Sequence, residues 1–321
     1  MASPTRSAPA WADSGQGLGQ LIAWLVRVRP LQHLLFSQAR QLIIRTAERN
    51  GIPWRRRRQE LLAAARPLLE ASRDPAVQPP GYYLARFHAY EQGNLCWQAA
   101  AEAEQATDAM ALRVWPEEKL QPAVAQRRLR EAIFALIEPS LASPLREVLD
   151  LGCSVGVSTQ ALAGWLRRRQ EGGGEQPPRV RGLDLSAHML AVARVRDGQG
   201  LVDGWIHARA EDTGLPSGSI DLITLQFVCH ELPQVATHGV LAEAARLLRP
   251  GGVLAMVDQD PGSAVLQRLP APVATLLKST EPYIEAYFRL DMAAALEAAG
   301  FRQLRAAACD PRHRVMVVNR Q

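Results

Sequence analysis

The spacing of hydrophobic residues along the chain changes near residue 145. Before it, over residues 18–141, hydrophobic residues recur every three or four positions, the period of amphipathic helices. After it, short hydrophobic or alternating runs predict strands, and helical runs separate most of them. We therefore predict a polar, disordered tail over residues 1–17, a helical region over 18–141 that caps the site, and a sheet-containing core over 142–321.

Seven segments of the core have the length and composition of strands. They are LREVLDLG, RVRGLDL, WIHARA, IDLITLQF, GVLAMVDQ, FRQLRAAAC and HRVMVVNR. The first five alternate with helical segments, which is typical of parallel strands, whereas only residues 310–312 separate the last two, as in an antiparallel hairpin. The pattern predicts an α/β fold with a doubly wound, seven-stranded, mostly parallel sheet and a helical N-terminal region.

The helical region begins with two hydrophobic stripes, one over residues 18–25 and one over 31–43, with Pro30 breaking the helix between them. Arginines lie on the other faces. Two helices packed on a core fit this pattern, and so does a basic amphipathic helix on a membrane surface. No run reaches the ~18 apolar residues of a membrane span, and the first residues do not have the order of a signal peptide. We expect a cytoplasmic protein, with peripheral membrane contact left open.

The formal net charge is +5, and nearly all of the positive charge comes from arginine, since Lys119 and Lys278 are the only lysines. Arginines cluster in WRRRR (54–58) and LRRR (166–169), which fits either contact with phosphates or a solvated helix face. The four cysteines have no metal-binding spacing, which fits a reduced compartment. Hydrophobic residues make up 47% of the chain, enough for a buried core.

The segment VLDLGCSVGVST (148–159) predicts a strand, a glycine turn and a helix. A phosphate loop needs a lysine that is absent here, and the dinucleotide fingerprint GxGxxG is met at only one of its three glycines. An acid followed by GxGxG is the pattern of S-adenosylmethionine sites. The chain matches it at Asp150, Gly152 and Gly156, with Ser154 in place of the middle glycine.

Two acidic residues suit such a ligand. Asp150 lies in the region where a carboxylate would meet the cationic amino group of S-adenosylmethionine. Asp184 ends the second predicted strand, where an acid accepts hydrogen bonds from both ribose hydroxyls. The alternative role of Asp184 as a helix N-cap is already filled by Ser186.

From residue 145 onward the chain resembles the class I S-adenosylmethionine-dependent methyltransferases, in particular the group that includes the ubiquinone and menaquinone C-methyltransferases. The matching segments are LDLGCSVG, GLDLSAHML, AEDTGLPSGSIDLI, RLLRPGGVLAMVD and AAGF. The resemblance implies S-adenosylmethionine as cofactor, a Rossmann-like methyltransferase fold, and adenine contacts at Ala210 and Glu211. Arg209 stands where the group often has an acid. FVCHELP (227–233), KSTEPY (278–283), DPRHR (310–314) and FHAYEQGNLCWQAA (87–100) resemble an uncharacterised subset from cyanobacteria and chloroplasts.

We also expect Leu185 after the second strand, and Gln226 and Phe227 at the end of the fourth, to line the cofactor site. Methyl transfer needs a nucleophile in line with the sulfonium, and a general base helps where that nucleophile is a hydroxyl or an acidic carbon. His230 and Glu231 follow the fourth strand and are the candidates for this role, although His230 also fits as a residue that lines the pocket.

Further polar residues are candidates for a substrate pocket. His88, Tyr90 and Glu91 lie in the helical region, which would fold over the mouth of the sheet as a lid or simply pack helix against helix. Glu281 and Tyr283 lie in an insertion after the fifth strand.

Three functions remain open at this point. A small-molecule methyltransferase fits best, and the resemblance to quinone enzymes favours a hydrophobic or prenylated acceptor. An RNA or protein methyltransferase would dock through the arginine clusters, but the chain reads QFVCHELP where an amino-methylating nucleic-acid enzyme has [DN]PP[YF], so nucleic acid is disfavoured. A non-catalytic module that binds S-adenosylmethionine or S-adenosylhomocysteine is the third. We expect no metal, because the fourth strand offers no Asp to match Asp258 and Asp260.

Overall fold

The computed structural model describes residues 8–13, 29–85, 87–88, 90, 92–141, 144–170 and 176–321. The longer helices before the sheet are α3 (Arg29–Arg49), α4 (Trp54–Ala65), α5 (Trp97–Leu112) and α6 (Pro122–Ile137). The strands are β1 (Glu147–Leu151), β2 (Arg179–Asp184), β3 (Gly204–His207), β4 (Ile220–Gln226), β5 (Leu248–Gln259), β6 (Phe301–Ala308) and β7 (His313–Arg320). All seven predicted strands are therefore present.

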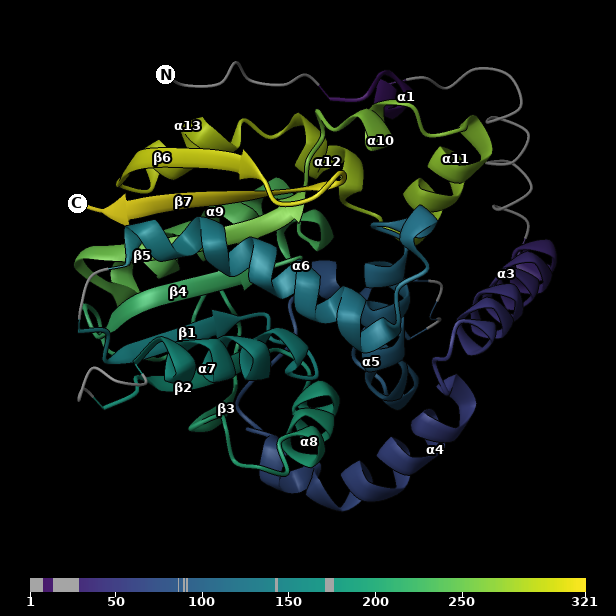
Figure 1. The fold of residues 1–321 in the computed structure, drawn as a ribbon, viewed down its shortest axis with the longest axis horizontal. Coiled ribbons are helices and arrows are strands. Elements are labelled where there is room, and N and C mark those ends of the chain that lie inside the picture. The colour runs from purple at the N-terminus through teal and green to yellow at the C-terminus, as the bar shows by residue number, and fades with distance from the viewer. Residues whose placement is uncertain are drawn as a thin grey trace.

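The strands form one sheet in the order β3-β2-β1-β4-β5-β7-β6 (Figure 1). The first five strands are parallel, and β7 runs antiparallel to both of its neighbours. The predicted hairpin of the last two strands is confirmed, with β7 inserted between β5 and β6. The strand order reverses between β1 and β4, and ligands of open α/β sheets bind where such a reversal occurs.

Helices cover both faces of the sheet. Those of the core are α7 (Val157–Gln170), α8 (Ala187–Arg196), α9 (Gln234–Leu247), α10 (Ala264–Gln267), α11 (Ala271–Thr280), α12 (Ile284–Arg289) and α13 (Met292–Ala298). Alternate residues of β1 point to opposite faces: Val148 packs with α6 and α7, and Leu149 packs with α9 and α13. Figure 1 shows α6 and α7 crossing the face of the sheet that is turned to the viewer.

The disordered tail predicted over residues 1–17 is wrong for the part that the structure describes. Ala10–Asp13 form the short helix α1, and Trp11 is 9% exposed within the core. The Trp11 ring packs edge-on against Phe288, with centroids 5.7 Å apart, and its Nε1 donates a hydrogen bond to the Leu266 carbonyl at 2.6 Å. Burial of this large ring, with its indole N–H hydrogen-bonded, holds the short segment against the core.

The two predicted stripes of the N-terminal region have different outcomes. Residues 18–25 lie outside the described residues, whereas 31–43 belong to α3. Among the residues that the structure describes, no helix is both long enough and apolar enough to span a membrane.

The arginines of the first cluster form ion pairs with acidic residues of the helical region. The pairs are Arg55 with Glu48, Arg56 with Glu60 at 3.6 Å, Arg57 with Glu104 at 2.7 Å, and Arg58 with Glu102 at 3.2 Å. In the second cluster, Arg169 lies 3.5 Å from Glu138, and Arg167 donates to the Leu201 carbonyl at 2.9 Å. Most of this positive charge is therefore balanced within the molecule, which leaves less of it for a phosphate backbone.

Candidate functional site

The turn after β1 has the backbone conformation of a glycine-rich loop. Gly152, Ser154 and Gly156 have φ values of 70°, 50° and 75°. Ser154 therefore keeps the left-handed conformation of the glycine that it replaces, at a cost of about 1–2 kcal/mol. Its backbone N–H donates to Asp184 Oδ2 at 2.7 Å, which helps to hold the strained residue in place.

Gly156 is the residue that this turn tolerates changing least. A Cβ at this position would lie 2.3 Å from the Trp205 ring, and the positive φ adds strain. We expect Gly156→Ala to destabilise the protein by about 3 kcal/mol, as the sum of left-handed strain and overpacking. Denaturant unfolding would measure this.

Gly164→Ala is the matched control, because this glycine lies inside α7 and its Cβ would meet only the flexible end of Arg168 at 3.4 Å. That variant should gain about 0.5–1 kcal/mol from helix propensity. An unfolding free energy of Gly156→Ala equal to that of the wild type would show that the turn does not have this geometry.

Asp150 lies behind the turn and is 1% exposed. Its Oδ2 accepts from the hydroxyls of Ser158 and Thr159 at 2.7 Å each, and its Oδ1 accepts from Thr224 at 2.6 Å. Burial raises the pKa of this carboxyl, and the three hydroxyl donors oppose that shift. The carboxylate thus ties the start of α7 to β4.

Asp184 ends β2 and is half-buried beside the turn. Its two oxygens accept from the backbone N–H groups of Ser154 and Ser186, at 2.7 and 2.8 Å. Burial raises the pKa of Asp184 to about 6, although these two donors oppose the shift. Ser186 is the N-cap of α8 and accepts from the Met189 N–H, as predicted.

The predicted adenine region lies after β3. Ala210 and Glu211 are half-buried, and the Tyr82 hydroxyl donates to Glu211 Oε1. Arg209 lies 3.6 Å from Glu211 and so partly offsets its charge. The carbonyl of Leu185 is 2.9 Å from His207 Nε2.

Gln226 and Phe227, both predicted to line the cofactor site, contact the α6 side of the sheet. Gln226 Oε1 accepts from Arg130 Nη1 at 2.7 Å, and the Phe227 ring packs edge-on against His313. Both side chains therefore have their partners in α6 and β7, on that side of the sheet.

His230 lies in the short helix η6 (Cys229–Glu231) directly after β4 and is 7% exposed. Its ring Nδ1 is 2.7 Å from Asp258 Oδ1, and its backbone N–H donates to Asp258 Oδ2 at 3.2 Å. Burial lowers the pKa of His230, but Asp258 outweighs this and raises it to about 9. The pairing with Asp258, at the end of the neighbouring strand, was not foreseen from the sequence.

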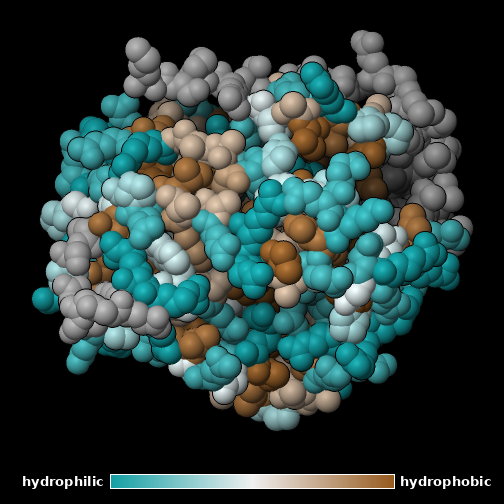
Figure 2. Space-filling model, in the orientation of Figure 1, coloured by the Kyte–Doolittle hydropathy of each residue, from teal (hydrophilic) through white to brown (hydrophobic). Residues whose placement is uncertain are grey.

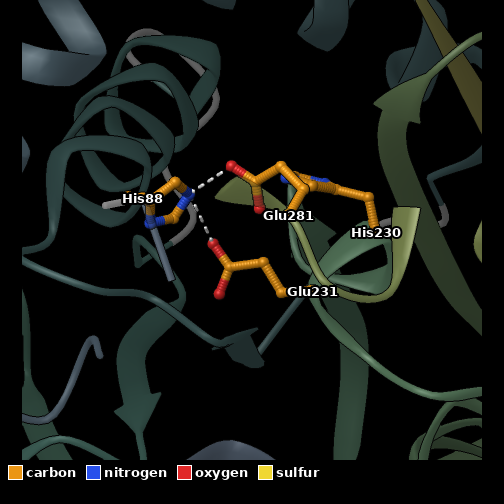
Figure 3. A group of neighbouring side chains, drawn as sticks. All are labelled: His88, His230, Glu231 and Glu281. Carbon is orange, nitrogen blue, oxygen red and sulfur yellow. Dashed lines mark ion pairs between the residues drawn. The ribbon is translucent and has the colours of Figure 1, made fainter. Parts of the chain in front are cut away.

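Four ionisable side chains from three separate segments converge here. We call them the His–Glu cluster, and it consists of His88, His230, Glu231 and Glu281 (Figure 3). His88 Nε2 lies between the two carboxylates, 3.3 Å from Glu231 Oε1 and 3.0 Å from Glu281 Oε1. The structure thus brings together two residues predicted after β4, one from the predicted lid and one from the predicted insertion.

Neighbouring residues orient the cluster. Glu231 Oε2 accepts from the Tyr83 hydroxyl at 3.0 Å and from Asn94 Nδ2 at 2.9 Å, and Asn94 Oδ1 is 3.0 Å from His88 Nδ1. Burial lowers the pKa of His88, but the two carboxylates raise it to about 10. Burial raises the pKa of Glu231, while the two histidines lower it.

The other predicted pocket residues have different positions. Tyr283 donates to the Tyr82 carbonyl at 2.8 Å and packs near Phe87, next to the cluster. Tyr90 instead donates to Glu102 Oε2 at 3.1 Å and packs against the hydrophobic residues shared by α4, α5 and α8. Glu91 lies outside the described residues.

The comparisons with known proteins agree on the class. A methyltransferase-domain family model matches residues 149–256. An uncharacterized methyltransferase of Synechocystis sp. is 30% identical over 169 residues, which cover 53% of this chain and 73% of that protein. The demethylmenaquinone methyltransferase of Bacillus licheniformis is 31% identical over 110 residues, covering 34% of this chain and 43% of the relative.

Among solved structures, a protein of Pyrococcus horikoshii aligns with a TM-score of 0.48 and 16% identity, covering 66% of this chain and 99% of its own. The strand order, the glycine turn with an acid at the tip of β2, and the sequence matches lead to one family. The chain belongs to the class I S-adenosylmethionine-dependent methyltransferases.

Proposed function

We propose that S-adenosylmethionine lies across the turn after β1, with its ribose hydroxyls on Asp184 and its adenine beside Ala210 and Glu211. The support is the position of Asp184, a carboxylate at the end of β2, next to β1 and its turn, that is already held by two backbone donors. Asp150 then has a different role from the amino-group contact expected from the sequence. It holds the turn in shape, since its carboxylate oxygens already accept hydrogen bonds from three hydroxyl groups of the protein.

We further propose that the methyl acceptor is a small molecule held at the His–Glu cluster. Val228, just before the cluster, packs on the turn so closely that a Cβ at Gly152 would lie 2.6 Å from it. The cluster therefore lies next to the turn, where the methyl group would be presented. Glu231 is the base candidate, because Asp258 raises the pKa of His230 and so favours its protonated form, which donates rather than accepts a proton.

The observation that carries this proposal is the cover over the strand ends. The segment 82–94 hydrogen-bonds to Glu211 through Tyr82, to Glu231 through Tyr83, and to Ser186 through the Asn94 carbonyl. A lid with three separate attachments favours an acceptor small enough to be enclosed.

Aromatic rings beside the cluster favour a hydrophobic acceptor. Tyr83 and Phe87 pack with centroids 5.0 Å apart, and Tyr283 lies 6.0 Å from Phe87. Peripheral membrane contact through the N-terminal helices would fit such an acceptor. Its support is α3, on which Leu42 and Ile43 are 63% and 36% exposed. The face in Figure 2 shows hydrophobic residues in small, separate groups among hydrophilic ones.

The test is to follow the labelled methyl group of S-adenosylmethionine in cell extract incubated with the protein. Label in organic-extractable material would support a hydrophobic small molecule, whereas label precipitated with RNA or protein would favour the docking alternative. Cofactor binding without transfer to any fraction would favour the non-catalytic module. Boiled protein controls for uncatalysed transfer.

A further inference from the structure

We propose that the His–Glu cluster binds one divalent transition-metal ion. Each of its four residues offers one ligand atom, and these atoms all lie within 4.8 Å of one another. Metal–ligand bonds to imidazole and carboxylate are about 2.0–2.2 Å long, so that opposite ligands of one ion are about 4.2 Å apart. Small side-chain rotations would bring the four atoms to that spacing.

The histidines are oriented as metal-ligating histidines usually are. His230 directs Nδ1 to Asp258 at 2.7 Å, and His88 directs Nδ1 to Asn94 Oδ1 at 3.0 Å. In both rings Nε2 is the remaining nitrogen, and His88 Nε2 is the atom that approaches the two carboxylates. A ligating histidine typically donates its other ring N–H to a carboxylate or carbonyl, which fixes the tautomer and makes the ligand more basic.

Glu281 supplies an independent observation. Its side chain is only 9% exposed, and its Oε2 is buried with no hydrogen-bond partner among the described residues. A buried carboxylate oxygen without a partner is costly, and a cluster of ion pairs alone leaves that cost in place. A cation between the four side chains would give this oxygen a partner.

The ligand set indicates the class of ion. Two imidazole nitrogens together with two carboxylates suit Mn²⁺, Fe²⁺, Co²⁺ or Zn²⁺ better than Mg²⁺ or Ca²⁺, which prefer oxygen ligands alone. His88 gives the ion access, since 39% of its side chain is exposed while the other three are largely buried. Binding would displace protons from the imidazoles, because a metal ligand must be unprotonated.

The consequence for the reaction rests on the proposed function. With an ion bound, Glu231 is a ligand and no longer a free base, so the cation takes over the activation of the acceptor. If the acceptor lies at the His–Glu cluster, the ion favours one that carries a hydroxyl or enol oxygen, whose pKa the bound cation would lower. The sequence-based expectation of no metal concerned Asp258 and Asp260. In this proposal Asp258 instead supports a ligand.

The experiment uses the full chain without a histidine tag, stripped with chelator and titrated with MnCl₂ while free Mn²⁺ is followed by electron paramagnetic resonance. We expect one ion per chain. His88→Ala and the near-isosteric Glu281→Gln should each weaken binding by about 100-fold, and Asp258→Asn by about 10- to 100-fold. His238→Ala is the control, since it changes an exposed histidine of α9 and should leave binding unchanged.

Thermal unfolding of each variant verifies that it is folded. Absence of stoichiometric binding of Mn²⁺, and of Co²⁺ and Zn²⁺ when each is titrated directly, would overturn the proposal, as would unchanged binding by both ligand variants. S-adenosylmethionine binding and methyl transfer are measured on the same samples. Transfer without metal binding overturns this inference alone, whereas metal binding without transfer supports it and counts against the proposed function.

Discussion

Replacing Asp184 with asparagine is expected to weaken S-adenosylmethionine binding by about 100-fold. Two hydrogen bonds from ribose hydroxyls to a carboxylate are together worth about 3 kcal/mol, which corresponds to that factor. The substitution also weakens the acceptor for the Ser154 N–H and so loosens the turn. Calorimetric titration of S-adenosylmethionine and S-adenosylhomocysteine would measure both affinities.

Asp203→Asn is the matched control. Asp203 accepts from the Val180 N–H at 2.8 Å, near the other end of the same strand from Asp184, and supports the sheet far from the turn. It should leave the affinity within about three-fold of the wild type. If Asp184→Asn binds S-adenosylmethionine with wild-type affinity, the ribose does not contact Asp184 and the cofactor lies elsewhere.

The same carboxylate predicts how binding depends on pH. The pKa of Asp184 is raised to about 6 in the protein without ligand, so a proton competes with the ribose below that value. Affinity should fall by up to about ten-fold for each unit below pH 6. For folding the sign is opposite: a raised pKa contributes stability at acidic pH, and that contribution is lost as pH rises through about 6. Asp184→Asn should remove both dependences.

The second large effect is expected for Glu231→Gln. This change keeps the shape of the side chain and removes its charge, and we expect methyl transfer to fall by at least about 100-fold, the usual contribution of a general base. S-adenosylmethionine affinity should stay within about three-fold, because Asp184 and the turn are unchanged. S-adenosylhomocysteine release, with an acceptor fraction that the wild type turns over, would measure the rate.

Glu297→Gln is the control for this loss. Its side chain is 75% exposed and pairs only loosely with Arg302, at 4.0 Å. Turnover by Glu231→Gln close to that of the wild type would exclude Glu231 from the reaction. Loss of cofactor binding together with turnover would instead mean that the substitution disturbs the turn.

The strand pattern and the local motifs could be predicted from the sequence alone. All seven strands, the final hairpin, the glycine turn and the N-cap at Ser186 follow from short-range rules. Strand periodicity and turn conformation depend on residues close together in the sequence, so a short segment is enough to predict each of these features. The order of the strands adds the reversal beside which we propose that the cofactor lies, and the resemblance of the motifs supplied the class.

Only the tertiary structure decided which polar residues meet. His88, Glu231 and Glu281 are far apart in the chain, and their approach depends on how the segment around His88 and the segment after α11 pack on the strand ends. Tyr90, two residues after His88, turns to α5 instead. The role of Asp150 and the partner of His230 were hidden for the same reason, because a hydrogen bond across a sheet has no signature in the local sequence. The periodicity of the sequence therefore determined the strands and helices, and long-range packing determined which polar side chains meet at their ends.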